Sequence, residues 1–384
     1  MSTHRDAVPA SFADSIPLAA HQKAADYTAA KTRLGIIGLL IDVALVLGFT
    51  IGGGLEALSR GWAHAFAPGS LTHGAALLLS LFFIQSIVSL PVELYRTFVI
   101  ENRFGFNRMT VRLFFVDLLK KTLVALVLGV PLLLAVLWLM EKMGRYWWFY
   151  VWIVLTAFGL ALQVIAPALI LPLFNKFTPI TDGELAGRVA ALLQRCGFKS
   201  RGLYKMDGSK RSNHGNAFFA GIGAGKRIVL FDTLIDRLKP SEAEAVLAHE
   251  LGHYKLHHVV KMIAVSAAAS FLGLWILGQL IDEPWFYAGL GSETRSTAAA
   301  LALFILIAGE FTYFLQPLIA LYSRKNEFEA DAYAKGHADA KDLVHALVKL
   351  YKDNASTLTP DPLHSAFYDS HPPPALRIAR LEVQ

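Results

Sequence analysis

The chain is organised around the stretch Ala248-His249-Glu250-Leu251-Gly252-His253, which contains the pattern H-E-x-x-H. Residues four apart on an α-helix lie on one face, so His249 and His253 can place two imidazoles on one metal ion. Glu250 lies about 100° further round the helix, where it can reach a water on that ion without being a ligand itself. The stretch therefore predicts a metal site with two histidine ligands and a neighbouring carboxylate base.

The residues before this pattern predict the helix that such a site requires. Ser241 suits the N-cap, and Glu244 follows three residues later, which is the spacing of a capping box. A polar helix with two solvated histidines is the alternative interpretation. Two histidines and a glutamate at this spacing on a helix are, however, typical of zinc peptidases.

The composition is that of a membrane protein. Of the 384 residues, 54% are hydrophobic and only 17% are charged, against about 25% charged in soluble proteins. The net charge of +6 could indicate a nucleic-acid partner, but Lys and Arg in a membrane protein more often mark cytoplasmic loops, so we expect no nucleic acid. The single cysteine, Cys196, excludes an intramolecular disulfide and is expected to be a small buried side chain.

Six apolar runs each reach the ~20 residues that are needed to cross a bilayer. They are about residues 34–58, 75–99, 119–140, 146–173, 259–281 and 298–321. The fourth run opens with Tyr146-Trp147-Trp148-Phe149-Tyr150, an aromatic belt typical of a membrane interface. Residues 1–33 are polar and show no signal-peptide pattern.

The loops between these runs alternate in basic content. Arg60 is the only basic residue of the first loop and Arg295 of the fifth, whereas the tail begins with Arg324-Lys325. By the positive-inside rule, both termini and the H-E-x-x-H region are expected on the cytoplasmic face. The long fourth loop and the tail can therefore build one domain. The expected division is 1–175 (N-terminal segment and four spans), 176–258 (first part of the peptidase domain), 259–322 (two spans) and 323–384 (second part).

The region between the fourth and fifth runs predicts mixed α and β structure. Residues 185–195 have a helical pattern, and residues 202–206 suit a short strand. Residues 216–220 and 227–231 are strand-like and predict a hairpin around the Gly-rich segment 221–225. The spacing of that segment does not fit a phosphate-binding loop.

A third metal ligand is expected just after the last apolar run, in the segment Glu327-Phe328-Glu329-Ala330-Asp331. Glu327 and Asp331 are four apart, so one can bind the metal while the other orients a ligand histidine. A solvated acidic helix start, favoured by the helix dipole, is an equally good interpretation of this spacing alone.

Taken together, these motifs resemble the integral-membrane zinc peptidases of the CAAX prenyl protease 1 family, which are of the gluzincin type. The resemblance rests first on residues 249–253 with Ser323-Arg324-Lys325-Asn326-Glu327-Phe328-Glu329-Ala330-Asp331. It covers about residues 90–380. Further matching stretches are residues 97–107, 165–167, 174–179, 226–232 and 370–373.

The resemblance implies roles for individual residues. It makes His249, His253 and Glu327 the ligands of one Zn²⁺ per chain and Glu250 the general base. It places Asp331 behind a ligand, and it makes His371 the group that stabilises the oxyanion, with Arg377 beside it. The stretch Asn216-Ala217-Phe218-Phe219 becomes the edge strand that binds substrate backbone, for which an ordinary amphipathic strand is the alternative.

For the fold, the resemblance implies a mainly α integral membrane protein, in which a multi-span helical bundle encloses a chamber and carries an α+β zincin-like cytoplasmic domain. Family members usually have a further membrane helix before the first run seen here, which makes seven. Glu310, inside the sixth run, is expected to face that hydrated chamber or a partner. His257 and His258 are expected at the interface, not as ligands.

The expected activity is that of a membrane-embedded zinc metalloendopeptidase. Its partners would be the lipid bilayer and a peptide or protein substrate, with a prenylated C-terminal CAAX segment implied by the resemblance alone. We expect a multi-pass protein of a bacterial inner membrane more than of the endoplasmic reticulum.

Three other functions share some of these sequence features. A membrane quality-control protease of the HtpX type shares the ligand motif but is shorter, with fewer spans before it. A six-span transporter would accommodate Glu310, but no inverted repeat is visible. A metal-binding scaffold without activity fits poorly, because binding a metal does not require Glu250.

Overall fold

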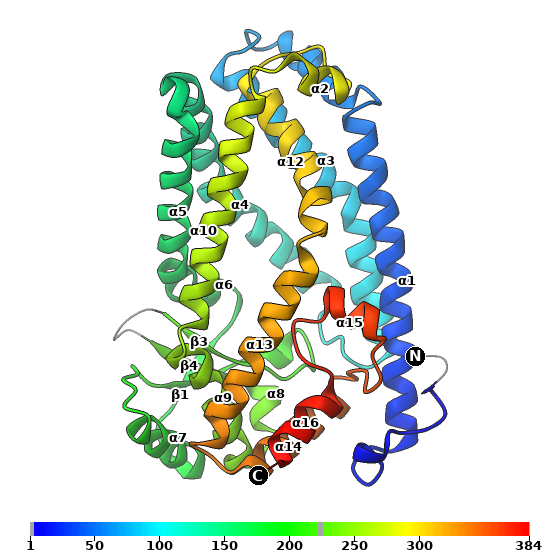
Figure 1. The fold of residues 1–384 in the computed structure, drawn as a ribbon, viewed down its shortest axis with the longest axis vertical. Helices are drawn as coiled ribbons and strands as arrows, with labels where there is room; N and C mark the ends of the chain where they lie inside the picture. The colour runs from blue at the N-terminus through cyan, green and yellow to red at the C-terminus, as the bar shows by residue number, and fades with distance from the viewer. Residues whose placement is uncertain (1–3, 222–225, 384) are drawn as a thin grey trace.

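The computed structural model describes residues 4–221 and 226–383. Figure 1 shows a tall helical bundle with a smaller α+β region at the end of the molecule that also holds both termini. The helices of the bundle are α1 (Leu18–Phe49), α2 (Gly54–Ala63), α3 (Leu71–Tyr95), α4 (Val111–Lys142), α5 (Trp147–Ile165), α6 (Leu171–Phe174), α10 (His258–Leu280), α11 (Pro284–Gly289), α12 (Thr297–Tyr313) and α13 (Gln316–Lys335). The π-helical segments Arg96–Glu101 and Ala166–Ile170 extend α3 and join α5 to α6.

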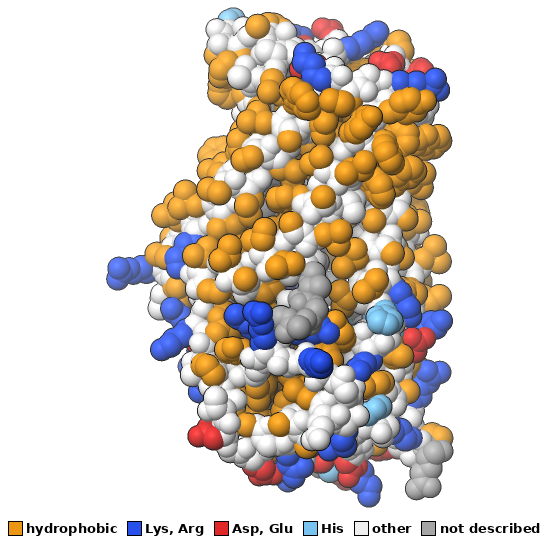
Figure 2. All heavy atoms as spheres, turned by 90° about the vertical axis from the view of Figure 1, so that its left-hand side faces the viewer, with side chains coloured by type: hydrophobic (Ala, Val, Ile, Leu, Met, Phe, Trp, Pro, Cys, Tyr) orange, Lys and Arg blue, Asp and Glu red, His pale blue; other side chains and the backbone are white. Residues whose placement is uncertain are grey.

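Within the described residues, five helices are long and apolar enough to cross a membrane, and α12 with α13 makes a sixth if this bent pair is one span. Hydrophobic side chains cover most of the bundle face in Figure 2, whereas charged groups gather toward the two ends of the molecule. The core between the helices contains fully buried residues from four of them, such as Leu77 of α3, Val151 of α5, Leu277 of α10 and Leu303 of α12. The expected fold, a mainly α membrane protein with a multi-span helical bundle, is thus confirmed.

Two of the expected spans have the wrong limits. The first helix covers Leu18–Phe49 instead of residues 34–58, because it ends before Gly52-Gly53-Gly54, where Gly53 has a φ of 75°. The sixth run is not one continuous helix, because α12 ends at Tyr313 and α13 leaves it at an angle of 61°. Pro317 explains this break, since its ring lacks an N–H group and would clash with the carbonyl of Tyr313 in a continuous helix.

The α+β region contains a four-stranded sheet of order β1-β2-β4-β3. Its strands are β1 (Phe177–Ile180), β2 (Leu203–Met206), β3 (Ala217–Ala220) and β4 (Arg227–Phe231). The pair β2–β4 is parallel and the other two pairs are antiparallel. The expected hairpin is confirmed as β3–β4, and residues 222–225 of its Gly-rich loop lie outside the described residues. The strand β1 was not expected, and β3 lies at the edge of the sheet.

Helices surround this sheet and come from both the long loop and the tail. They are α7 (Gly183–Arg195), α8 (Asp232–Ile235), α9 (Pro240–Lys255), α14 (Ala340–Asp353), α15 (Pro362–Tyr368) and α16 (Pro374–Glu382). Buried residues of α7, α9 and α14, such as Leu192, Leu247 and Leu343, pack into one core with β4. The buried Cys196 belongs to the same core, as expected.

The helix α9 carries the H-E-x-x-H pattern, but it begins earlier than expected. Its first residue is Pro240, its N-cap is Lys239, and the Glu242 carboxylate accepts a hydrogen bond from the Lys239 backbone N–H at 2.8 Å. Proline suits the first helical position because its fixed φ is helical and its missing N–H would be unpaired there. The predicted capping box of Ser241 and Glu244 is therefore wrong, and Glu244 instead binds Arg188 and Arg195.

The helices α9 and α13 approach very closely at Gly252. A Cβ atom at position 252 would lie 2.9 Å from the Cα of Ala330 and 3.1 Å from the Cβ of Tyr333. Glu327 lies well inside α13, so its segment is not the acidic helix start that the sequence alone allowed. The absence of a side chain at Gly252 thus brings the histidines of α9 next to Glu327.

We expect Gly252→Ala to lower the apparent midpoint of thermal unfolding in detergent. The added methyl group would cost about 1–3 kcal/mol by overpacking, which exceeds the roughly 1 kcal/mol gained from helix propensity. Gly187→Ala on α7 is the matched control, because no atom lies within 4 Å of its added Cβ, and it should leave the midpoint unchanged or raise it. Equal midpoints for both variants would contradict the close contact.

Candidate active site

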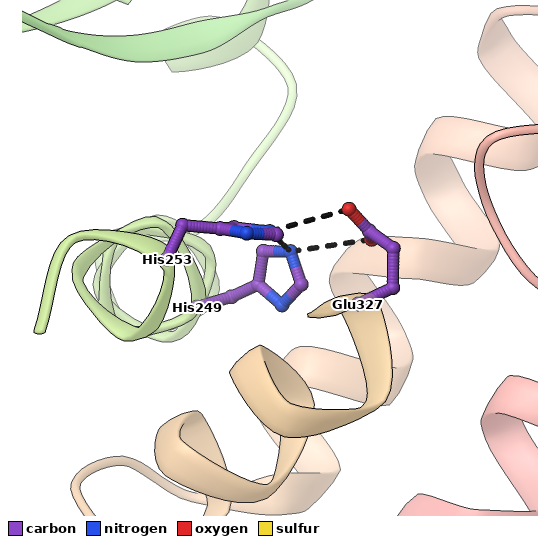
Figure 3. A group of neighbouring side chains, drawn as sticks. All are labelled: His249, His253 and Glu327. Carbon is purple, nitrogen blue, oxygen red and sulfur yellow. Dashed lines mark hydrogen bonds and ion pairs between the residues drawn. The ribbon is translucent and has the colours of Figure 1, made fainter. Parts of the chain in front are cut away.

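Three side chains with metal-binding atoms converge between α9 and α13. Figure 3 shows His249 and His253 projecting from α9 toward Glu327 of α13. The Nε2 atoms of the two histidines lie 3.2 Å apart, and Glu327 Oε1 lies 3.2 Å from His253 Nε2. The other carboxylate oxygen, Oε2, lies 3.5 Å from His249 Nε2. The structure therefore brings together the three residues that the sequence analysis expected as ligands.

These separations fit a tetrahedral zinc site. With metal–ligand bonds of ~2.0–2.1 Å, two ligand atoms of a tetrahedron lie about 3.3–3.4 Å apart. Glu327 Oε2 is buried and, within the described part of the chain, has no hydrogen-bond partner. Although burial favours the neutral ring, the adjacent carboxylates of Asp331 and Glu327 raise the pKa of His249 to about 9. The site thus favours positive charge, which a divalent cation can supply in place of a proton.

Asp331 and Arg377 hold His249 from behind. Asp331 Oδ1 lies 2.8 Å from His249 Nδ1, the ring nitrogen that points away from the other two donor groups. Arg377 of α16 donates two hydrogen bonds to the same carboxylate, from Nε at 2.6 Å and from Nη2 at 2.7 Å. All three side chains are buried. The geometry is that of a ligand histidine oriented by a carboxylate, and the buried Arg377 lies behind that carboxylate.

His258 holds His253 in a similar way and was missed by the sequence analysis. Its Nε2 lies 3.0 Å from Glu329 Oε2, and its Nδ1 lies 3.0 Å from His253 Nδ1. Because the ionised Glu329 carboxylate only accepts, His258 carries its proton on Nε2, and its Nδ1 accepts from His253 Nδ1–H. This leaves Nε2 of His253 free to bind a metal. His258 is buried, whereas His257 is exposed. Among the described residues neither belongs to the ligand group, and their expected interfacial position stays a prediction.

Glu250 lies between the two ligand histidines in sequence, whereas His371 comes from the distant tail, and both adjoin the ligand group in space. Glu250 is half-buried, and burial raises the pKa of its carboxyl group, an effect that the nearby His249 and His253 oppose. His371, in the loop between α15 and α16, lies with Nε2 3.5 Å from Glu327 Oε1 and has a side chain that is 66% exposed. The tail thus supplies a histidine that remains accessible to a substrate.

The expected substrate strand coincides with β3. Ala217 to Phe219 belong to this edge strand and pair with β4, and Asn216 directly precedes it. Helix α9 contacts β3, which brings the strand near the ligand histidines. A substrate role for Asn216, Ala217, Phe218 and Phe219 stays a prediction.

Comparisons with known proteins agree along the whole chain. Residues 1–176 match a family model described as the CAAX prenyl protease N-terminal region with five membrane helices, and residues 179–384 match peptidase family M48. The CAAX prenyl protease 1 homolog of Arabidopsis thaliana is 38% identical over 81% of this chain and 74% of its own length. The CAAX prenyl protease 1 of Saccharomyces cerevisiae is 33% identical over 98% of this chain and 88% of its own length.

Solved structures agree with these sequence matches. The crystal structure of S. mikatae Ste24p superposes with a TM-score of 0.91 at 31% identity, and covers 99% of this chain and 93% of the Ste24p chain. These matches favour a membrane metallopeptidase over a transporter, an inactive metal-binding scaffold or an HtpX-type protease.

We predict a graded loss of zinc across three variants. Glu327→Ala should abolish stoichiometric zinc, because it removes one of three donor groups. His258→Ala should only weaken zinc affinity, by about 10- to 100-fold, because it removes the group that orients His253. His257→Ala is the matched control and should bind zinc as the parent does. Metal analysis and competition with a chelating dye measure all three, and undiminished zinc in Glu327→Ala would refute the ligand assignment.

Proposed function

This chain belongs to the CAAX prenyl protease 1 family of M48 metallopeptidases, and from that premise we propose that it hydrolyses peptide bonds with a zinc ion held by His249, His253 and Glu327. It is an integral membrane metallopeptidase that acts on peptide or protein substrates. The observation that carries the zinc proposal is the convergence of three donor groups at tetrahedral separations next to Glu250.

The residues around the ligand group have separate parts in the proposed reaction. A bound zinc ion supplies a Lewis acid that activates water and polarises the scissile carbonyl. Glu250 accepts the proton of the attacking water and later passes it to the leaving amine. His371 donates a hydrogen bond to the oxyanion that develops on the carbonyl. Asp331 orients the ring of His249 through its contact with Nδ1. Arg377 in turn fixes Asp331 through two hydrogen bonds.

The substrate backbone is proposed to pair with the outer edge of β3. This strand lies at the end of the sheet and forms its described ladder bonds with β4 only. An extended peptide added there gains main-chain hydrogen bonds, and its side chains alternate between two faces. The half-buried rings of Phe218 and Phe219 lie on opposite faces of the strand, so they are placed to contact alternate side chains of the peptide.

A prenylated C-terminal CAAX segment is the proposed substrate class. The relatives named above are described as CAAX prenyl proteases, and the chain shares its membrane bundle with them. A bilayer-embedded enzyme meets a lipid-modified peptide in the membrane that holds both. The membrane itself, bacterial inner membrane or endoplasmic reticulum, stays a prediction, and these relatives are eukaryotic.

We expect the purified protein to cleave a farnesylated CAAX peptide and to cleave the same peptide without the farnesyl group more slowly. Glu250→Gln should retain zinc and fold but lose about 10²–10⁴-fold in kcat, because the amide is nearly isosteric but cannot accept the proton. Mass spectrometry of the cleavage products measures both effects. Parent-like turnover by Glu250→Gln would exclude it as the base, and equal rates on the two peptides would remove the prenyl requirement.

The proposed orientation places both termini, residues 176–258 and residues 323–384 on the cytoplasmic face. The charge alternation between the spans supports it, and Figure 1 shows the termini and the sheet at the same end of the bundle. Reporter fusions after Gly291, between α11 and α12, and at the C-terminus should report opposite faces. Finding both reporters on one side would refute the six-span topology.

A further inference from the structure

The loop that carries His371 is short and lies between two helices. It joins the end of α15 at Tyr368 to the start of α16 at Pro374, and its His371 side chain is largely exposed. The hydrogen bond that His371 makes is local, at 3.0 Å between its Nδ1 and the hydroxyl of Ser370. A donor to an oxyanion must be fixed before the reaction. Pro372 and Pro373 restrict the backbone on the C-terminal side, so an anchor is needed on the other side.

Arg324 of α13 provides this anchor. Its Nη1 donates to the backbone carbonyls of Ser365 at 2.8 Å and of Asp369 at 2.9 Å. These carbonyls belong to the last turn of α15 and to the residue that follows it, and the Ser365 carbonyl also accepts a hydrogen bond from the Asp369 backbone N–H at 3.2 Å. A guanidinium there forms charge-assisted bonds and also complements the helix dipole. Within the described chain Arg324 forms no ion pair, so its charge is directed to this loop.

The position of Arg324 on α13 connects the loop to the metal site. Arg324 precedes Glu327 by three residues, so both side chains lie on nearly the same side of one helix. The helix α13 therefore carries a proposed zinc ligand, Glu327, and also binds, through Arg324, the backbone carbonyls that precede His371. A second contact, 3.1 Å between the hydroxyls of Tyr313 and Tyr368, joins α15 to the end of α12. His371 Nε2 lies 3.5 Å from Glu327 Oε1. This distance depends on α13, because α13 carries Glu327 and also binds the segment before His371.

We propose that Arg324 is a positioning residue that fixes the 365–371 segment so that His371 reaches the reacting carbonyl. This inference rests on the proposed function, in which His371 stabilises the oxyanion. Arg324 itself touches neither the ligand atoms nor the substrate in this arrangement. Its contribution should therefore appear only through His371.

A double-mutant cycle of Arg324→Gln and His371→Ala tests the inference. His371→Ala alone should lower kcat by about 10²–10³-fold, and Arg324→Gln alone by about 10- to 100-fold, since a displacement of about 1 Å can cost that much. Both should keep zinc and leave KM little changed. The double variant should be no slower than His371→Ala alone, because Arg324 has nothing left to position. Arg324→Lys, with one charged nitrogen, should retain more activity than Arg324→Gln.

Arg195→Gln is the matched control for a general loss of stability. Arg195 also binds a backbone carbonyl, that of His337 at 3.0 Å, together with the carboxylate of Glu244. It does not contact the 365–371 segment, so this variant should keep kcat while it lowers the unfolding midpoint. If Arg324→Gln cannot be recovered folded, the same cycle with Arg324→Lys applies the same criterion.

The outcomes separate the inference from the proposal beneath it. Three results would each overturn the positioning role of Arg324: the losses in kcat of the two single variants multiply in the double variant, Arg324→Gln leaves kcat unchanged, or Arg324→Gln loses zinc. An unchanged kcat in His371→Ala, with Glu250→Gln still inactive, would overturn the proposed role of His371. A fall in kcat for Arg324→Gln in that case would show that Arg324 acts by another route, and would overturn the inference as well.

Discussion

The close contact between α9 and α13 is the constraint on which the proposed metal site depends. Gly252 lacks the side chain that would separate the two helices, and Ala330 lies directly against it. His249 and His253 flank Gly252 on α9, and Glu327 lies one turn before Ala330 on α13. The same contact therefore sets the separation of all three donor groups. Because a zinc–ligand bond is only ~2.0–2.1 Å long, a change of about 1 Å in helix spacing would take a donor out of range.

Each of the two ligand histidines near this contact is supported by its own set of charged or polar side chains. Asp331 and Arg377 support His249 through its Nδ1, whereas Glu329 acts on His253 through His258. An unpaired buried ion would cost several kcal/mol, so these partners must be assembled together. Arg377 comes from the tail and His258 from the start of a membrane helix. The ligand set is thus complete only when the two halves of the peptidase region and the bundle have folded against one another.

The bundle and the candidate site are connected through the consecutive helices α12 and α13. Pro317 breaks the last apolar run, so α12 stays in the bundle while α13 turns away by 61° and carries Arg324, Glu327 and Asp331 into the α+β region. A second connection is made by Arg211 of the segment between β2 and β3, which donates two hydrogen bonds to Asp117 of α4. These two connections hold the sheet region against the helices.

The sequence by itself determined the membrane bundle, the strands β2 to β4 and the pair of candidate ligands His249 and His253, because apolar run length and a four-residue spacing are local properties of the chain. The assignments of Glu327 and His371 rested on the resemblance to the family. The prediction from the sequence was wrong about the start of α9, the first span and the continuous sixth run, where Pro240, Gly53 and Pro317 set where the helices begin or end. Asp331 was already expected behind a ligand, and only the tertiary structure added His258 and Glu329 to the groups that support the ligands. His258, Glu329 and Arg324 act across contacts between separate elements, and such contacts leave no periodic signal in the sequence.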